Sequence, residues 1–88
     1  MDTPDQTIID QQIKMAMSLI EQELRSALTK FPGHFRNSHE GYAVLLEEVD
    51  ELWDEIKDNK REGSIERQCN EAVQVGAMAA KFILPYVK

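Results

Sequence analysis

Three features that shape many proteins are scarce or missing in this sequence: cysteine, long apolar runs and a basic start. Cys69 is the single cysteine among 88 residues, which excludes an internal disulfide and a zinc site built from several cysteines. The longest apolar candidate, residues 72–87, is interrupted by polar side chains and a proline, so we expect no membrane-spanning helix. The first residues lack the basic and apolar regions of a signal peptide, and we therefore expect a cytoplasmic protein.

Basic residues are also in the minority. The chain has 16 acidic and 10 basic residues and a net charge of −6. Duplex nucleic acid and anionic membranes repel such a surface, so we expect neither as a partner. An acidic protein that handles phosphates usually needs a metal ion between its carboxylates and the ligand.

Helical periodicity dominates the remaining signal. Apolar residues recur three and four positions apart, and no stretch alternates as a β-strand does. We expect a polar lead-in over residues 1–6 and helices over residues 7–30, 38–57 and 64–84, within a single domain spanning 1–88. The predicted fold class is all-α, a bundle of three main helices. A chain this short builds a thin core, so we expect oligomerisation to complete the bundle.

The second and third expected helices have distinct apolar patterns. The third is apolar almost all round from Ala72, which is typical of a helix buried in a bundle or at a subunit interface. Ser38 and Ser64 are the expected N-caps of the two helices. In the second helix, one apolar stripe is interpreted as core: Tyr42, Leu45, Leu46, Val49, Leu52, Trp53 and Ile56.

The connector FPGHFRN, between the first two helices, holds more aromatic and basic side chains than a turn requires. We expect Phe31 and Phe35 to anchor this loop to the core. His34 and Arg36 either face an anionic ligand, such as a substrate phosphate, or are solvated loop residues.

The second helix crowds acidic residues, and like charges three or four positions apart destabilise a helix. No Lys or Arg of this helix precedes Lys57. A divalent cation is one explanation of this crowding, and a solvated acidic face is the other. Lys57 and Lys60 either offset substrate phosphate charge or complement the dipole at the end of the helix. The acidic residues are Glu40, Glu47, Glu48, Asp50, Glu51, Asp54 and Glu55.

Some of these acids follow the pattern E-E-x-x-E. Glu48 and Glu51, or Glu47 and Glu51, lie one turn apart and can present two carboxylates to one point. Glu71 and Gln74 open the apolar run of the third helix, where an unpaired charge is costly to bury. If the two helices pack side by side, these groups form a hard-oxygen site suited to Mg²⁺, or to Mn²⁺. Alternatively, Glu71 favours the helix dipole and Gln74 is a polar boundary residue.

This pattern resembles the MazG-like all-α nucleotide pyrophosphohydrolases, whose signature is E-E-x-x-E on one helix and E-x-x-D on a later one. The resemblance spans residues 40–82 at Glu47, Glu48, Glu51 and Glu71, and looks particularly like the short MazG-like proteins of bacteriophages and their hosts. It implies a Mg²⁺-dependent hydrolase that cleaves a nucleoside or deoxynucleoside triphosphate to the monophosphate and pyrophosphate. It also implies a homodimer or homotetramer.

The sequence departs from the family at Gln74, where the family has aspartate. An amide coordinates through oxygen but brings no negative charge. The consequence is weaker metal binding, a site shifted toward Glu40, Asp50 or Glu55, or lost catalysis. The resemblance implies Glu48, Glu51, Glu71 and Gln74 as metal ligands, and Glu47 and Glu51 as catalytic groups.

Two other functions stay open. A non-catalytic MazG-like oligomer would bind a nucleotide or a protein partner, which Gln74 and the small residues of the third helix favour. A purely structural oligomer, such as an acidic accessory protein that blocks a host factor, would show no specific response to Mg²⁺.

Overall fold

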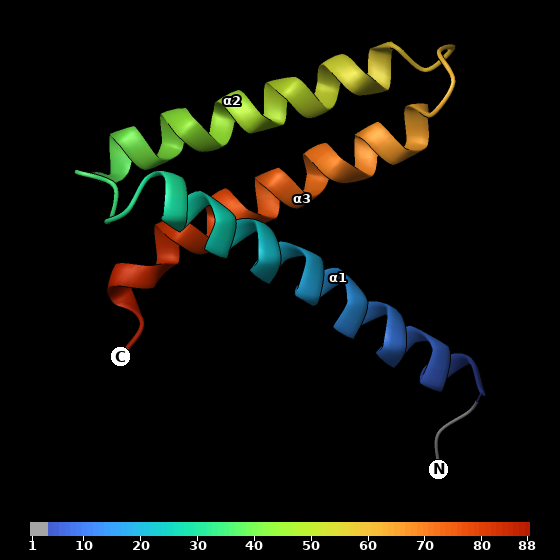
Figure 1. The fold of residues 1–88 in the computed structure, drawn as a ribbon, viewed down its shortest axis with the longest axis horizontal. Coiled ribbons are helices and arrows are strands. Elements are labelled where there is room, and N and C mark those ends of the chain that lie inside the picture. The colour runs from blue at the N-terminus through green and yellow to red at the C-terminus, as the bar shows by residue number, and fades with distance from the viewer. Residues whose placement is uncertain (1–3) are drawn as a thin grey trace.

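The computed structural model describes residues 4–88 and contains three long helices. They are α1 (Pro4–Lys30), α2 (Ser38–Lys57) and α3 (Ser64–Ile83), followed by a short 3₁₀ helix, η1 (Leu84–Tyr86). In Figure 1, α2 and α3 lie side by side as an antiparallel hairpin, and α1 crosses α3 while its N-terminal part extends away from the hairpin. No strand occurs in the part of the chain that the structure describes, and the all-α prediction is confirmed.

Two helix boundaries differ from the prediction. α1 begins at Pro4, earlier than expected, because proline is compatible with the first turn and Asp5 there favours the helix dipole. Residues 1–3 of the expected lead-in lie outside the described residues. α3 ends at Ile83 and continues as η1, with Pro85 inside this last turn.

The N-cap of α2 is Asn37 and not Ser38. The Asn37 Oδ1 accepts a hydrogen bond from the Glu40 backbone N–H at 2.9 Å, and the Glu40 Oε1 accepts one from the Arg36 N–H at 3.1 Å. This reciprocal arrangement is close to a capping box. The sequence prediction was off by one residue, because Asn and Ser serve equally well as caps.

The start of α3 also differs from the prediction. Gly63 is the N-cap, with a φ of 78° that favours glycine. Ser64 lies inside the first turn, where it is buried and its Oγ accepts a hydrogen bond from Gln68 Nε2 at 3.0 Å. Arg67 further fixes this end of the hairpin, since its Nε bonds to Glu55 on α2 at 2.8 Å.

α3 is the shared neighbour of the other two helices, because α1 and α2 each pack on α3 and not on each other. Glycines permit these close contacts. A Cβ on Gly41 of α2 would lie 2.5 Å from the Phe82 ring, and one on Gly76 of α3 would lie 2.8 Å from Ile20 Cδ1 of α1. The two helix crossings therefore depend on the absence of a side chain at these two positions.

The apolar stripe of α2 is only partly buried, which corrects its interpretation as core. Tyr42 and Trp53 are 63% and 55% exposed, and Leu46 and Val49 are exposed as well. α2 packs on α3 alone, and α3 covers only one edge of this apolar stripe. The half-buried members are Leu45, Leu52 and Ile56.

Little of the chain is buried. Among the described residues, Ala77 and Met78 are the only buried apolar residues, and Phe31, expected to anchor its loop, is 70% exposed. Phe35 does pack inward, against Gly41. None of the described helices is long and apolar enough to cross a membrane.

We expect Gly41→Ala to destabilise the protein. Overpacking costs about 1–3 kcal/mol, which exceeds the gain of up to about 1 kcal/mol from replacing a helical glycine. Urea denaturation followed by circular dichroism measures the difference. Exposed Ala43→Gly reports the helix-propensity term on the same helix. A Gly41→Ala variant more stable than wild type would show that the Phe82 ring moves aside at little cost.

Candidate functional site

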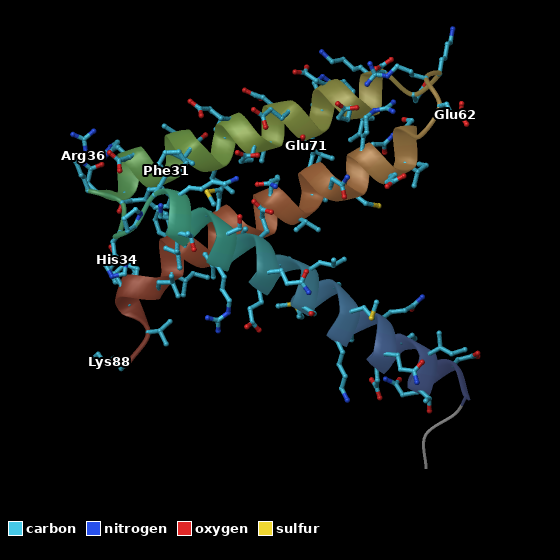
Figure 2. The ribbon with its side chains drawn as sticks, viewed as in Figure 1. Phe31, His34, Arg36, Glu62, Glu71 and Lys88 are labelled. Carbon is cyan, nitrogen blue, oxygen red and sulfur yellow. The ribbon has the colours of Figure 1, made fainter. Side chains whose placement is uncertain are left out.

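Three carboxylates converge where α2 packs on α3. Glu48 and Glu51 lie one turn apart on α2, and Glu71 lies on α3; one oxygen of each can be chosen so that all lie within 4.8 Å of one another. Figure 2 shows Glu71 between the two helices of the hairpin. The sequence predicted this set, and the structure brings its three acidic members together. We call Glu48, Glu51 and Glu71 the carboxylate cluster.

No basic side chain within residues 4–88 forms an ion pair with the carboxylate cluster. Five ion pairs link the described residues, and none includes Glu48, Glu51 or Glu71. Arg36 instead pairs with Glu40 at 2.6 Å, and Arg67 with Glu55 at 2.8 Å. Glu40 and Glu55, two of the three acids toward which the site could shift, are therefore already paired with arginines.

Burial and mutual repulsion raise the pKa values of Glu48 and Glu71 in the carboxylate cluster. Burial, followed by the charge of Glu51, raises the pKa of Glu48 to about 7, and Glu71 and Glu47 add to the rise. Burial and then the Glu51 charge also raise the pKa of Glu71. The Glu71 Oε2 is buried and has no hydrogen-bond partner among the described residues. Such a set binds a proton or a cation more readily than isolated carboxylates do.

The donor set fits a hard divalent cation. Carboxylate oxygens are the ligands that Mg²⁺ and Mn²⁺ prefer, and Mg²⁺ binds through a few carboxylates while it retains waters. Two oxygens bound to one Mg²⁺ lie at most about 4.2 Å apart, so the carboxylates need to move little to share an ion. The buried, unpartnered Oε2 of Glu71 is a ready ligand atom.

A cavity of about 520 Å³ extends from the carboxylate cluster to the loop between α1 and α2. Glu48 and Gln74 line its cluster side, and His34 lines its loop side. In Figure 2, Phe31, His34 and Arg36 gather at the end of the hairpin opposite to Glu62. Gln74 thus lines the same cavity as Glu48, and His34 faces this cavity from the loop.

Lys81 is a cavity residue that the sequence prediction missed. It is only 8% exposed, its Nζ donates a hydrogen bond to the Phe31 carbonyl at 3.3 Å, and it lies 4.8 Å from the centre of the Phe35 ring. These contacts hold the loop against α3 and place a cation in the cavity wall. A single lysine within an apolar helix was the available signal.

Other predicted residues lie outside the carboxylate cluster. Glu47 is exposed and acts on the cluster through its charge on Glu48. Arg36 lines a separate small cavity, and its guanidinium forms an ion pair with Glu40. At the opposite end of α2, Lys57 pairs with Asp54 at 3.3 Å. Lys60 is exposed in the loop between α2 and α3.

We expect the stability of the metal-free protein to fall as pH rises from about 4.5 to 7. Glu48 has a higher pKa in the folded chain than in the unfolded chain, so the folded state binds more protons in this window. Glu71, whose pKa is also raised, contributes in the same direction. Thermal melts in chelator across this range measure the slope, and Glu48→Gln should flatten it. A wild-type slope equal to that of Glu48→Gln would contradict the assignment.

Comparison with family models, with curated proteins and with solved structures finds no match.

Proposed function

We propose that this protein is a Mg²⁺-dependent nucleotide pyrophosphohydrolase that cleaves a nucleoside or deoxynucleoside triphosphate to the monophosphate and pyrophosphate. The single observation that carries the proposal is the carboxylate cluster at the contact of α2 and α3, which has no basic partner. The resemblance of its pattern to the MazG-like hydrolases supplies the reaction. Mn²⁺ has the same ligand preference and is proposed as a substitute.

The chain's residues have separate roles in this proposal. Glu48, Glu51 and Glu71 hold the metal, and the Gln74 amide oxygen assists from the neighbouring cavity wall. Glu47 and Glu51 orient the attacking water. The bound ion would supply a Lewis acid for the phosphate oxygens and an activated water.

The cavity offers space for the rest of the substrate. The basic side chain of Lys81 and the imidazole of His34 line it together with the aromatic rings of Phe31 and Phe35, and Glu23 and Glu40 lie in the same wall. Arg36, Lys57 and Lys60 are proposed only as longer-range partners of phosphate, since the first two already pair with acids. A triphosphate substrate would place the protein in the cytoplasm.

We also propose that the chain works as a homodimer or homotetramer, because only two apolar residues of its described part are buried. The alternative function is a MazG-like oligomer that binds a nucleotide or a protein without hydrolysis. Gln74 favours this alternative, because it removes one negative charge from the family's ligand set.

Mg²⁺ should raise the melting temperature of the wild type. A ligand at 100 times its dissociation constant adds about 2.7 kcal/mol to the stability of the folded state. At about 4–8 °C per kcal/mol, the expected rise exceeds 10 °C under that condition. Glu71→Gln should abolish the rise, and Glu66→Gln, an exposed acid in the first turn of α3, should keep it. An equal rise in all three proteins would mean general charge screening and would contradict the metal site.

Glu51→Gln should lower pyrophosphate release from nucleoside triphosphates by about 100-fold or more, as expected for a lost acid–base group that is also a ligand. Circular dichroism would verify unchanged helix content, and Glu66→Gln serves again as the control. If Glu51→Gln releases pyrophosphate at the wild-type rate, the catalytic assignment is wrong. If the wild type binds Mg²⁺ but releases no pyrophosphate from any triphosphate, the non-catalytic alternative holds.

A further inference from the structure

A row of large apolar side chains lies exposed along one side of α2. Tyr42, Leu46, Val49 and Trp53 follow steps of four, three and four residues and are 41–63% exposed. This is the spacing of the buried positions of a coiled coil. At 3.6 residues per turn, the row lies on the side of α2 away from Glu48 and Glu51.

α3 extends this apolar surface. Ile65, Ala72 and Ala79 follow each other at seven-residue steps, and Ile83 lies one turn further; Ile65 and Ile83 are 71% and 54% exposed. A groove of about 450 Å³ joins the two helices and is lined by Ser38, Tyr42, Leu45, Ala79, Phe82 and Ile83. None of these residues lines the cavity beside the carboxylate cluster. We call this surface of α2 and α3 the apolar hairpin face.

The side chains that define the apolar hairpin face include no carboxylate, although the chain carries a net charge of −6 and Asp50 borders the row one turn from Leu46. The other six acids of α2, from Glu40 to Glu55, occupy the remaining sides of that helix. Two copies of an acidic chain repel each other on most surfaces. On the apolar hairpin face, two copies can approach with less repulsion between like charges. A second copy is therefore compatible with this face.

The exposed area of the chain matches the requirement of a dimer. One copy exposes 7038 Å², whereas a compact monomer of 10.1 kDa exposes about 5,300 Å². The excess, about 1,700 Å² per copy, is shared between the hairpin and the N-terminal part of α1, and it exceeds the roughly 800 Å² that each partner contributes to a standard interface. The radius of gyration, 15.3 Å, is likewise larger than the roughly 12 Å expected for a compact chain of this length.

We propose that the apolar hairpin face is the interface between two copies of this chain, in which α2 and α3 of each copy form a four-helix bundle. This face would be the contact surface of the proposed oligomer, and its role does not depend on hydrolysis or metal binding. Because the carboxylate cluster lies on the other side of the hairpin, it stays accessible in this dimer. Trp53, the single tryptophan, lies within the interface and reports on its formation.

Sedimentation velocity and light scattering test this interface on the full chain. The wild type should have at least twice the 10.1 kDa mass of one copy, and its Trp53 emission should shift to longer wavelength on dilution. Val49→Glu should raise the dissociation constant about 100-fold or more, because symmetry places two unpaired carboxylates in the interface. Ile65→Glu should act in the same direction from α3, at a side chain that is 71% exposed in the single copy.

Ala43→Glu is the matched control. Ala43 is an exposed residue of α2 outside the apolar row, and its change adds the same charge to the same helix. This variant should retain the wild-type mass, and circular dichroism of all variants separates dissociation from unfolding. A monomeric wild type at 100 μM would overturn the proposal and favour a different partner. Retention of the full mass by folded Val49→Glu and Ile65→Glu would also overturn it, and a loss of mass in Ile13→Glu alone would assign the interface to α1.

Discussion

The packing of α2 on α3 is the constraint on which the rest of this structure depends. It brings Glu71 to within reach of Glu48 and Glu51, although these residues are far apart in the sequence. The same contact requires Gly41, because the Phe82 ring occupies the space of a side chain there. It also divides α2 into an acidic side, an apolar side and an edge against α3. The site and the proposed interface are thus two consequences of one helix pairing.

Several basic side chains of the hairpin pair with other acids and leave the carboxylate cluster without a neutralising partner among the described residues. Arg36 and Arg67 neutralise Glu40 and Glu55, at opposite ends of α2, and both pairs also fix a helix end. Among the described residues, Glu48, Glu51 and Glu71 receive no such partner, and burial raises the pKa of Glu48 to about 7. A purely solvated acidic face would leave each carboxylate in water near its usual pKa. The convergence of two half-buried acids, Glu48 and Glu71, with the exposed Glu51 is therefore better explained by a bound cation.

Helix positions and the Glu48–Glu51 pair followed from the sequence because both depend on periodicity, whereas Glu71 joins this pair only through the packing of α2 on α3. A three- or four-residue step places two side chains on one helix face, whatever the rest of the fold does. Burial did not follow, since it depends on how many neighbours a helix has. Tyr42 and Trp53 have the spacing of core residues, yet 63% and 55% of their surfaces stay exposed because α2 packs on one helix only. Lys81 was missed because its contacts with the Phe31 carbonyl, 50 positions away, and with the Phe35 ring join residues far apart in the sequence.

Because the hydrophobic core is small, a bound cation or a second copy would add a large share of the stability of the folded state. Ala77 and Met78 alone are buried apolar residues in the described chain, which leaves a small margin for folding. A cation at the carboxylate cluster and a second copy on the apolar hairpin face would each bind only the folded hairpin. Two such ligands are thermodynamically linked even without direct contact, since each raises the folded fraction available to the other. The opposite placement of the two surfaces lets both act at once, so that metal binding and assembly reinforce each other through the folding of α2 on α3.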